Sequence, residues 1–153
     1  MPDRGTSERP PRVPPRWFVR FFWTAHRFVY KDTGGRLGLR RARPDRWGML
    51  RLRTIGRRTG KERSVILGYL DDGPNMVLVA MNGWADPDPA WWLNLQAHPE
   101  AVADLRGERR EVTARRATEE ERSRMWTRLL GPHGDAYAAL RSRETAVVIL
   151  EPR

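Results

Sequence analysis

The sequence predicts an α+β fold built on a small barrel, with roughly five or six short strands, mostly in antiparallel hairpins, and three or four helices. Three observations lead to it. The segment "GMLRLRTI" (48–55) alternates apolar and charged residues, as a half-buried strand does. Turn residues in "DDGP" (71–74) separate two apolar runs. Thr118 and Glu121 form a capping box ahead of a helical segment.

The chain divides into three parts in this interpretation. Residues 1–15 are rich in Pro, Arg and polar groups and predict a disordered basic tail. Residues 16–33 predict an amphipathic helix, because cations fall at helical spacing around Thr24 and aromatic residues fill much of the remaining circumference. Three glycines in "DTGGRLG" then break the helix. Residues 34–153 are expected to form the barrel domain.

The elements of that domain follow in order. After residues 48–55, apolar and β-branched runs predict strands at 64–70, 75–81, 101–107, 109–117 and 145–150. Pro89 and Pro99 bracket a short helix around Ala90 to Ala97. The capping box starts a helix that runs to about Leu130, and residues 131–144 read as a loop with a short helix.

Composition limits the functional classes. The chain has 153 residues, a formal net charge of +10 and a pI near 11.3, so an anionic partner is expected. It contains no cysteine, which excludes disulfides and thiol nucleophiles. No secretory signal and no spanning apolar run are visible. We therefore expect a cytoplasmic protein, free or peripheral at the inner face of the membrane.

The connection "IGRRTGKER" (55–63) concentrates positive charge between two strands. It resembles a P-loop, but three residues separate Gly56 from Gly60 where the Walker pattern needs four, and Glu62 stands where a magnesium ligand is required. What remains is an anion site, in which glycines turn backbone N–H groups and guanidinium groups toward one point. A solvated turn that happens to be basic explains the loop as well as an anion site does.

Other motifs narrow the chemistry further. The three histidines are far apart in the sequence, so no metal site is expected. No serine lies in a G-x-S-x-G context, which argues against an elbow-type hydrolase. In "GWADPDPAWWLN" (83–94), adjacent Trp91 and Trp92 are not expected to face one core, so one of them packs inward while the other lines a pocket or a flat ring. The alternative, which is the commoner case for tryptophan, is that both are partly buried core residues. An aromatic ligand with a charged tail accounts for the tryptophans and the basic loop together.

The order of these motifs resembles the deazaflavin-dependent nitroreductase family, whose members use coenzyme F420. The resemblance rests on "RTIGRRTGKERSV" (53–65), "VLVAMNGWADPDPAWWLNLQAHPEA" (77–101) and "VVILEP" (147–152), and it covers about Gly34 to Pro152. It implies a split β-barrel related to flavin-binding reductases. It also implies an oxidoreductase that passes a hydride from the reduced deazaflavin to a planar acceptor, such as a quinone, an enone or a nitro compound.

The resemblance also implies which residues bind the coenzyme. The basic loop and the strand after it would hold the phosphate and polyglutamate tail and line the deazaflavin: Arg57, Arg58, Thr59, Arg63, Ser64, Val65, Ile66, Leu67 and Gly68. A second wall and the helix against the chromophore would be Val79, Ala80, Met81, Asn82, Ala90, Trp91, Trp92, Leu93 and Asn94. Tyr137 is implied as the residue that orients or protonates the acceptor.

Three departures from the family pattern affect the acceptor side. Trp84 stands where the family has the second glycine of its A-S-x-G-G motif, and Met81 stands where it has serine. In "LLGPHGDAYAAL" the family often carries several tyrosines, and only Tyr137 is present here.

The competing class is a basic binding module without turnover, either a deazaflavin carrier or a nucleic-acid-binding protein. No helix-turn-helix, RNP or zinc pattern supports nucleic acid, so we expect no nucleic-acid partner. The remaining expected partners are a second copy of the chain in a homodimer and a membrane surface contacted by residues 16–33. Packing of residues 16–33 against the barrel explains their pattern at least as well.

Overall fold

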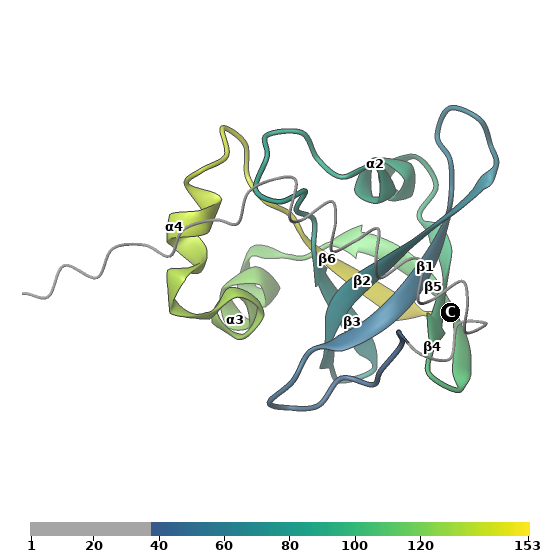
Figure 1. Cartoon of the computed structure of the whole chain (residues 1–153), viewed down its shortest axis with the longest axis horizontal. Coiled ribbons are helices and arrows are strands. Elements are labelled where there is room, and N and C mark those ends of the chain that lie inside the picture. The colour runs from purple at the N-terminus through teal and green to yellow at the C-terminus, as the bar shows by residue number, and fades with distance from the viewer. Residues whose placement is uncertain (1–37) are drawn as a thin grey trace, which may run out of the picture.

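The computed structural model describes residues 38–153, and the tail and amphipathic helix predicted for residues 1–33 lie outside this range. Six antiparallel strands close into a barrel in the order β1-β2-β3-β6-β5-β4 (Figure 1). The strands are β1 (Gly48–Ile55), β2 (Glu62–Asp72), β3 (Asn75–Val79), β4 (Glu100–Leu105), β5 (Glu108–Arg116) and β6 (Val147–Pro152). The helices are α2 (Ala90–Ala97), α3 (Glu119–Leu130) and α4 (Gly134–Ala138), with a 3-10 turn, η1 (Gly131–His133), before α4. The predicted α+β barrel is confirmed.

The barrel interior is built by alternation along the strands. In β1, Leu50, Leu52 and Thr54 are buried, whereas Arg51 and Arg53 between them are only partly covered. Because successive side chains of a strand point to opposite faces, one face of β1 enters the core and the other meets solvent. The pairing of β1 with β2 runs from Gly48 opposite Tyr69 to Ile55 opposite Glu62, so β1 ends and β2 begins beside the basic loop.

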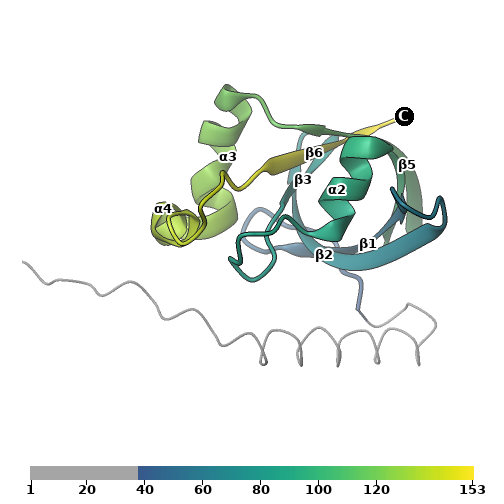
Figure 2. The same ribbon diagram turned by 90° about the horizontal axis from the view of Figure 1, so that it is seen from above.

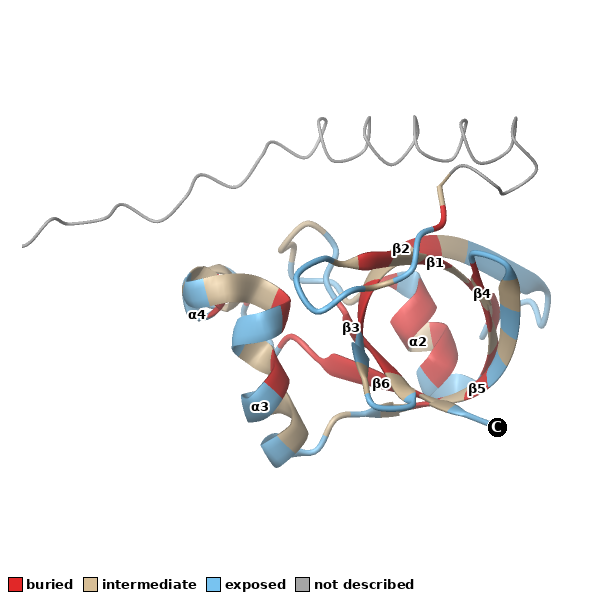
Figure 3. Ribbon diagram, turned by 90° about the horizontal axis from the view of Figure 1, so that it is seen from below, coloured by how far each residue is buried: buried red, intermediate tan, exposed pale blue. Residues whose placement is uncertain are grey.

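Strands β3 and β6 are buried on both faces. Met76 and Leu78 point into the barrel, and the alternate residues Val77 and Val79 belong to a second apolar cluster with Met125 and Leu129 of α3. This second cluster explains why both strands read as continuous apolar runs in the sequence. Figure 3 shows the two strands carrying buried residues on the side of the barrel where α3 lies.

Helix α2 lies across one end of the barrel. It contacts β1, β2 and β5, and its Trp91, Trp92 and Leu95 are buried in the same cluster as the barrel interior. Figure 2, which looks along the barrel, shows α2 within the ring of strands. Within residues 38–153, no helix combines the length and the apolar character needed to cross a membrane.

Helix α3 begins with the predicted capping box. The Thr118 hydroxyl accepts the backbone N–H of Glu121, and the Glu121 carboxylate accepts the backbone N–H of Thr118 at 2.8 Å. The same carboxylate also accepts two bonds from Arg115, each 2.7 Å long. Hydrogen bonds from Arg115 and from the Thr118 backbone lower the pKa of Glu121 to about 2.

This depressed pKa predicts a pH dependence of stability. Because the pKa of Glu121 is lower in the folded chain than the roughly 4.3 of an unfolded glutamate, its stabilisation is complete above that value and is lost as the pH falls toward about 2. We expect Glu121→Gln to lower the free energy of unfolding at pH 7, and the difference from wild type to shrink between about pH 5 and pH 2. Urea unfolding at several pH values measures it.

Glu119→Gln is the matched control, because Glu119 is exposed on the same turn and forms no ion pair within residues 38–153. A difference between Glu121→Gln and wild type that stays constant from pH 7 to pH 2.5 would contradict the assignment.

Candidate functional site

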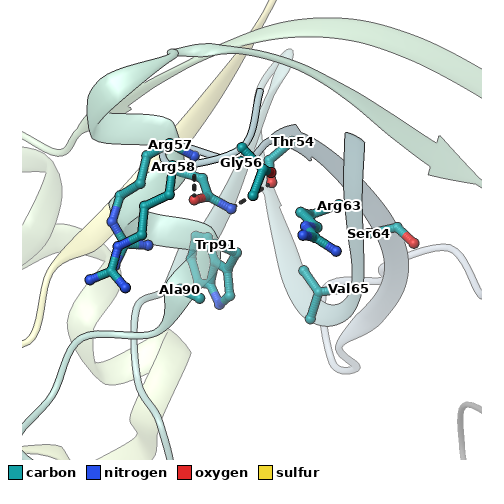
Figure 4. Close-up of a pocket in the computed structure, with 11 residues that line it drawn as sticks. Thr54, Gly56, Arg57, Arg58, Arg63, Ser64, Val65, Ala90 and Trp91 are labelled. Atoms are coloured by element: carbon teal, nitrogen blue, oxygen red, sulfur yellow. Dashed lines mark hydrogen bonds between the residues drawn. The ribbon is translucent and has the colours of Figure 1, made fainter. Parts of the chain in front are cut away.

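A pocket of about 510 Å³ opens between the β1–β2 loop and the start of α2. One side is formed by Arg57 and Arg58, which extend in the same direction near Ala90 and Trp91, and the other by Arg63, Ser64 and Val65 of β2 (Figure 4). Its lining residues are Thr54, Gly56, Arg57, Arg58, Thr59, Arg63, Ser64, Val65, Ala90, Trp91 and Asn94.

The cations around this pocket are available to a ligand. Arg57, Arg58, Lys61 and Arg63 are exposed, and within residues 38–153 none of them forms an ion pair. Elsewhere arginines are engaged: for example, Arg53 donates two hydrogen bonds to Asp104. Four unpaired positive charges within seven residues make this loop a site of strong positive potential that favours an anion.

The loop backbone is held by its own hydrogen bonds. The N–H of Gly56 donates to the Lys61 carbonyl and that of Gly60 to the Gly56 carbonyl, both at 2.8 Å. Gly60 has a φ of +67°, and a Cβ at Gly56 would lie 2.9 Å from the Thr59 hydroxyl oxygen, so the tight turn requires both glycines. The N–H groups of these two glycines are therefore engaged within the turn and are not free to bind a ligand. The loop presents its guanidinium groups instead.

Asn94 fastens the loop to α2. Its Oδ1 accepts the backbone N–H of Arg57 at 3.1 Å, and its Nδ2 donates to the Thr54 hydroxyl at 3.3 Å. Asn94 and Thr54 are 5% and 1% exposed, so these bonds join three segments beneath the pocket. Thr54 and Gly56 were not among the residues expected in the site. The signal for Thr54 was present, because it continues the inward series of Leu50 and Leu52 as a polar residue.

Both tryptophans of α2 are buried, which corrects the expectation that they cannot share one core. Trp91 is 6% exposed and Trp92 is 4% exposed, and both belong to the barrel cluster. The physical reason is the position of α2 across the barrel end, where strands surround it on more than one side. Trp91 also lines the pocket, so packing inward and lining the pocket are properties of the same side chain.

The structure brings together about half of the expected coenzyme residues. Arg57, Arg58, Thr59, Arg63, Ser64, Val65, Ala90, Trp91 and Asn94 line the pocket. The others lie outside its lining: Ile66, Leu67, Gly68, Val79, Ala80, Met81, Asn82, Trp92 and Leu93. Leu67 packs against the barrel core beside Val65, whereas a Cβ at Gly68 would meet Trp47 on the opposite face of β2. Met81 and Asn82 are exposed in the loop after β3.

Tyr137 lies on α4, outside the lining of this pocket. Its ring stacks on that of Trp84, with centroids 5.4 Å apart and planes inclined by 12°. Trp84 has a φ of +62°, a left-handed conformation that costs a bulky residue on the order of 1–3 kcal/mol. Position 84 thus keeps the left-handed backbone conformation that glycine favours, as expected where the deazaflavin-dependent nitroreductase pattern has glycine, but its side chain is a tryptophan.

The residues that line the pocket suit an anionic coenzyme with a flat ring. Unpaired guanidinium groups match phosphate and carboxylate oxygens, and Trp91 and Val65 offer apolar surface beside them. Helix α2 adds to this potential, because no side chain caps its start at Ala90, which faces the pocket, and a helix N-terminus favours negative charge. Within residues 38–153 no cluster of His, Asp or Glu side chains could hold a metal ion.

Comparison with known proteins decides the family. The sequence pattern of the F420H2-dependent quinone reductase family matches residues 23–152. The chain belongs to this family. It is an F420-dependent reductase, as the resemblance to the deazaflavin-dependent nitroreductase family predicted, but the matching family is one of quinone reductases, so the nitroreductase part of that resemblance is only loosely supported.

Individual relatives agree. A Mycobacterium tuberculosis (strain H37Rv) protein, whose assigned function is F420H2-dependent quinone reduction, is 34% identical over 103 residues, which are 63% of this chain and 83% of that protein. A solved F420-H2 dependent reductase, FDR-A, is 26% identical, with a TM-score of 0.60 over 72% of this chain and 96% of its own. A solved domain-swapped dimer is 25% identical, with a TM-score of 0.61 over 90% of this chain and all of its own.

The role of Asn94 leads to a prediction for stability. Asn94→Ala leaves the buried Thr54 hydroxyl and the Arg57 N–H without these partners, and we expect it to lower the free energy of unfolding by about 1–3 kcal/mol. It should also weaken coenzyme binding, because the loop is no longer tied to α2. Gln96→Ala on the exposed face of α2 is the control and should change stability by no more than about 0.5 kcal/mol. Thermal unfolding and a coenzyme titration of both variants check this, and equal stabilities would refute it.

Proposed function

We propose that the β1–β2 loop grips the phosphate and carboxylate tail of F420 and that the pocket beside it receives the deazaflavin end. The observation that carries this assignment is that Arg57, Arg58 and Arg63 line one pocket with a tryptophan wall. These three and Lys61, which lies on the same loop, form no ion pair within residues 38–153. Arginine binds such oxygens with two parallel hydrogen bonds, so these side chains suit phosphate and carboxylate groups alike.

The flat end of the coenzyme has a defined place in this proposal. Trp91 and Val65 supply the apolar walls of the pocket. Leu67, the next inward residue of β2, and the segment 80–82 after β3 extend these walls toward the acceptor, whereas Val79 packs in the cluster against α3. When bound, the reduced deazaflavin supplies a hydride. The protein fixes the orientation of the deazaflavin ring and orients the acceptor. The buried residues of α2 exclude water from the ring.

Conversion of a quinone to a hydroquinone requires one proton in addition to the hydride. In this proposal the Tyr137 Oη donates a hydrogen bond to the acceptor oxygen, and either that hydroxyl or water supplies the proton. A quinone is the favoured acceptor, because quinone reduction defines the family. Enones and nitro compounds share the planar, electron-poor character and form the wider substrate range to be tested.

The main test is a coenzyme titration with charge-reversal variants. We expect Arg58→Glu combined with Arg63→Glu to weaken F420 binding by about 100-fold or more, since each guanidinium contributes charge-assisted hydrogen bonds of about 1.5–3 kcal/mol. Deazaflavin fluorescence measures the affinity, and the wild-type affinity should fall as salt rises.

The matched control is Arg106→Glu combined with Arg109→Glu. These arginines are exposed, form no ion pair within residues 38–153, and lie at the β4–β5 turn. The register of β1 with β4 puts that turn at the opposite end of the barrel. Unchanged F420 affinity in the Arg58/Arg63 variant would make the loop assignment wrong. FMN and a short DNA duplex serve as competitors, and tight duplex binding without F420 affinity would favour the basic binding module.

Localisation and assembly stay proposals of the same kind. The basic aromatic pattern of residues 16–33 supports peripheral contact with an anionic membrane, and the domain-swapped relative supports a homodimer. Co-sedimentation with phosphatidylglycerol vesicles, compared between the full chain and a chain lacking residues 1–33, tests the first. Sedimentation equilibrium tests the second. Equal vesicle binding by both chains, or a monomer at all concentrations, would exclude the respective proposal.

A further inference from the structure

A second aromatic feature lies outside the pocket. The stacked rings of Trp84, in the loop between β3 and α2, and Tyr137, on α4, are both only partly buried. Part of this stack therefore meets solvent, where a further flat ring can add to it. Neither residue lines the pocket that the basic loop surrounds.

The backbone beneath Trp84 is unusual. Gly83 and Trp84 are consecutive residues with left-handed φ values of +58° and +62°. Bulky L-residues adopt this conformation rarely, and such strain persists only where the surroundings enforce it, often at ligand sites.

A buried arginine fixes the chain that follows Trp84. The Arg141 side chain is 0% exposed and forms an ion pair with Asp88 at 2.7 Å. Its guanidinium also donates to the carbonyls of Ala85 at 3.0 Å and Asp86 at 2.9 Å. The next backbone N–H, that of Ser142, donates to the Asp86 carboxylate at 2.6 Å. The loop that carries Trp84 is thus bound to the segment that directly follows α4.

The charges near this stack differ from those at the basic loop. Arg141 and Arg143 both pair with Asp88, and the Asp86 carboxylate lies beside them. Hydrogen bonds from Ser142 lower the pKa of Asp86, so it stays ionised. The arginines near Trp84 are therefore already neutralised, whereas those of the β1–β2 loop are unpaired. This environment suits a neutral flat ring and not an anionic tail.

We propose that the Trp84–Tyr137 stack is the platform on which a neutral planar acceptor lies, and that Arg141 is the positioning residue that holds Trp84 in place. The proposal rests on the proposed function, because it assigns the acceptor side of the same reaction. If the acceptor lies on this stack, Trp84 determines acceptor selectivity, at a position where the deazaflavin-dependent nitroreductase pattern has glycine.

The experiment uses menadione, a naphthoquinone without a tail, as the acceptor. Trp84→Gly suits the left-handed backbone, so the variant should fold at least as well as wild type. We expect its KM for menadione to rise about tenfold, the size of a lost stacking partner, with kcat and the affinity for F420 unchanged. Trp84→Phe should restore the KM to within about threefold of wild type, because a ring is again present.

Tyr137 offers a matched pair of variants. Tyr137→Phe keeps both rings but removes the hydroxyl proposed to donate to the acceptor, so the menadione KM should rise less than in Trp84→Gly, and a lower kcat in this variant would report the hydroxyl. Tyr137→Leu removes the second ring and should raise the KM as Trp84→Gly does. Calorimetry of menadione binding to the coenzyme-free chain should show the same order of affinities, independently of turnover.

Arg141→Lys tests the positioning role, because lysine keeps the charge beside Asp88 but loses the fork that reaches two carbonyls. We expect the menadione KM to rise in the single variant and to rise no further when Arg141→Lys is added to Trp84→Gly. Such non-additivity shows that Arg141 acts through Trp84. Effects that simply add would mean that Arg141 stabilises the fold without positioning the platform.

The outcomes separate the two proposals. A wild-type chain that binds F420 and reduces menadione, with the same KM in Trp84→Gly, overturns the platform alone. A chain that neither binds F420 nor turns over quinones overturns the proposed function. In that case calorimetry still decides the platform, which fails if menadione binds wild type and Trp84→Gly equally.

Discussion

The position of α2 across the barrel end governs most of the site. Trp91 and Trp92 bury nearly all of their surface there, and a tryptophan that buries 150–250 Å² contributes roughly 4–6 kcal/mol as an upper bound. This burial fixes the helix against β1, β2 and β5. It brings Asn94 within reach of the β1–β2 loop, and it turns the start of α2 toward the pocket. If α2 moved, the pocket would lose one wall and the loop its fastening.

The distribution of charge follows from this frame. Arginines along the barrel and on α3 are largely engaged, as Arg115 is with Glu121 and Glu151, and Arg124 with Asp72. The cations of the β1–β2 loop form no ion pair within residues 38–153, although the exposed Glu62 lies among them. Within residues 38–153, unpaired positive charge is therefore dense at this end of the barrel, whereas part of the net charge of +10 belongs to residues 1–37. An anion would experience a local attraction at this end of the barrel.

Much of the fold was accessible from the sequence because local patterns determine it. The residues predicted for β1 and α2, and the start of α3 at its capping box, agree with the structure. Strand β2 is longer than predicted, since Glu62 and Arg63 pair with β1 while both are exposed, and polar residues at a strand end carry no hydrophobic period.

For the candidate site, composition and resemblance pointed to the loop cations and to Trp91. The contacts of Asn94 with Thr54 and of Arg141 with residues 85–88 were not predicted. They join residues at least 37 positions apart, and no local pattern encodes such pairings.

The arrangement of the two aromatic regions has an evolutionary consequence. The residues proposed for coenzyme binding lie on the β1–β2 loop and on α2, whereas Trp84 and Tyr137 lie on a connecting loop and a short helix outside the barrel. Within residues 38–153, the segment before α2 that Arg141 contacts joins the two regions. On these proposals, substitutions at position 84 or in α4 would change which acceptor is admitted without altering the surface proposed to bind the coenzyme. A gene duplicate of this protein would need few mutations to acquire a new substrate, provided that Asp88 and Arg141 were retained.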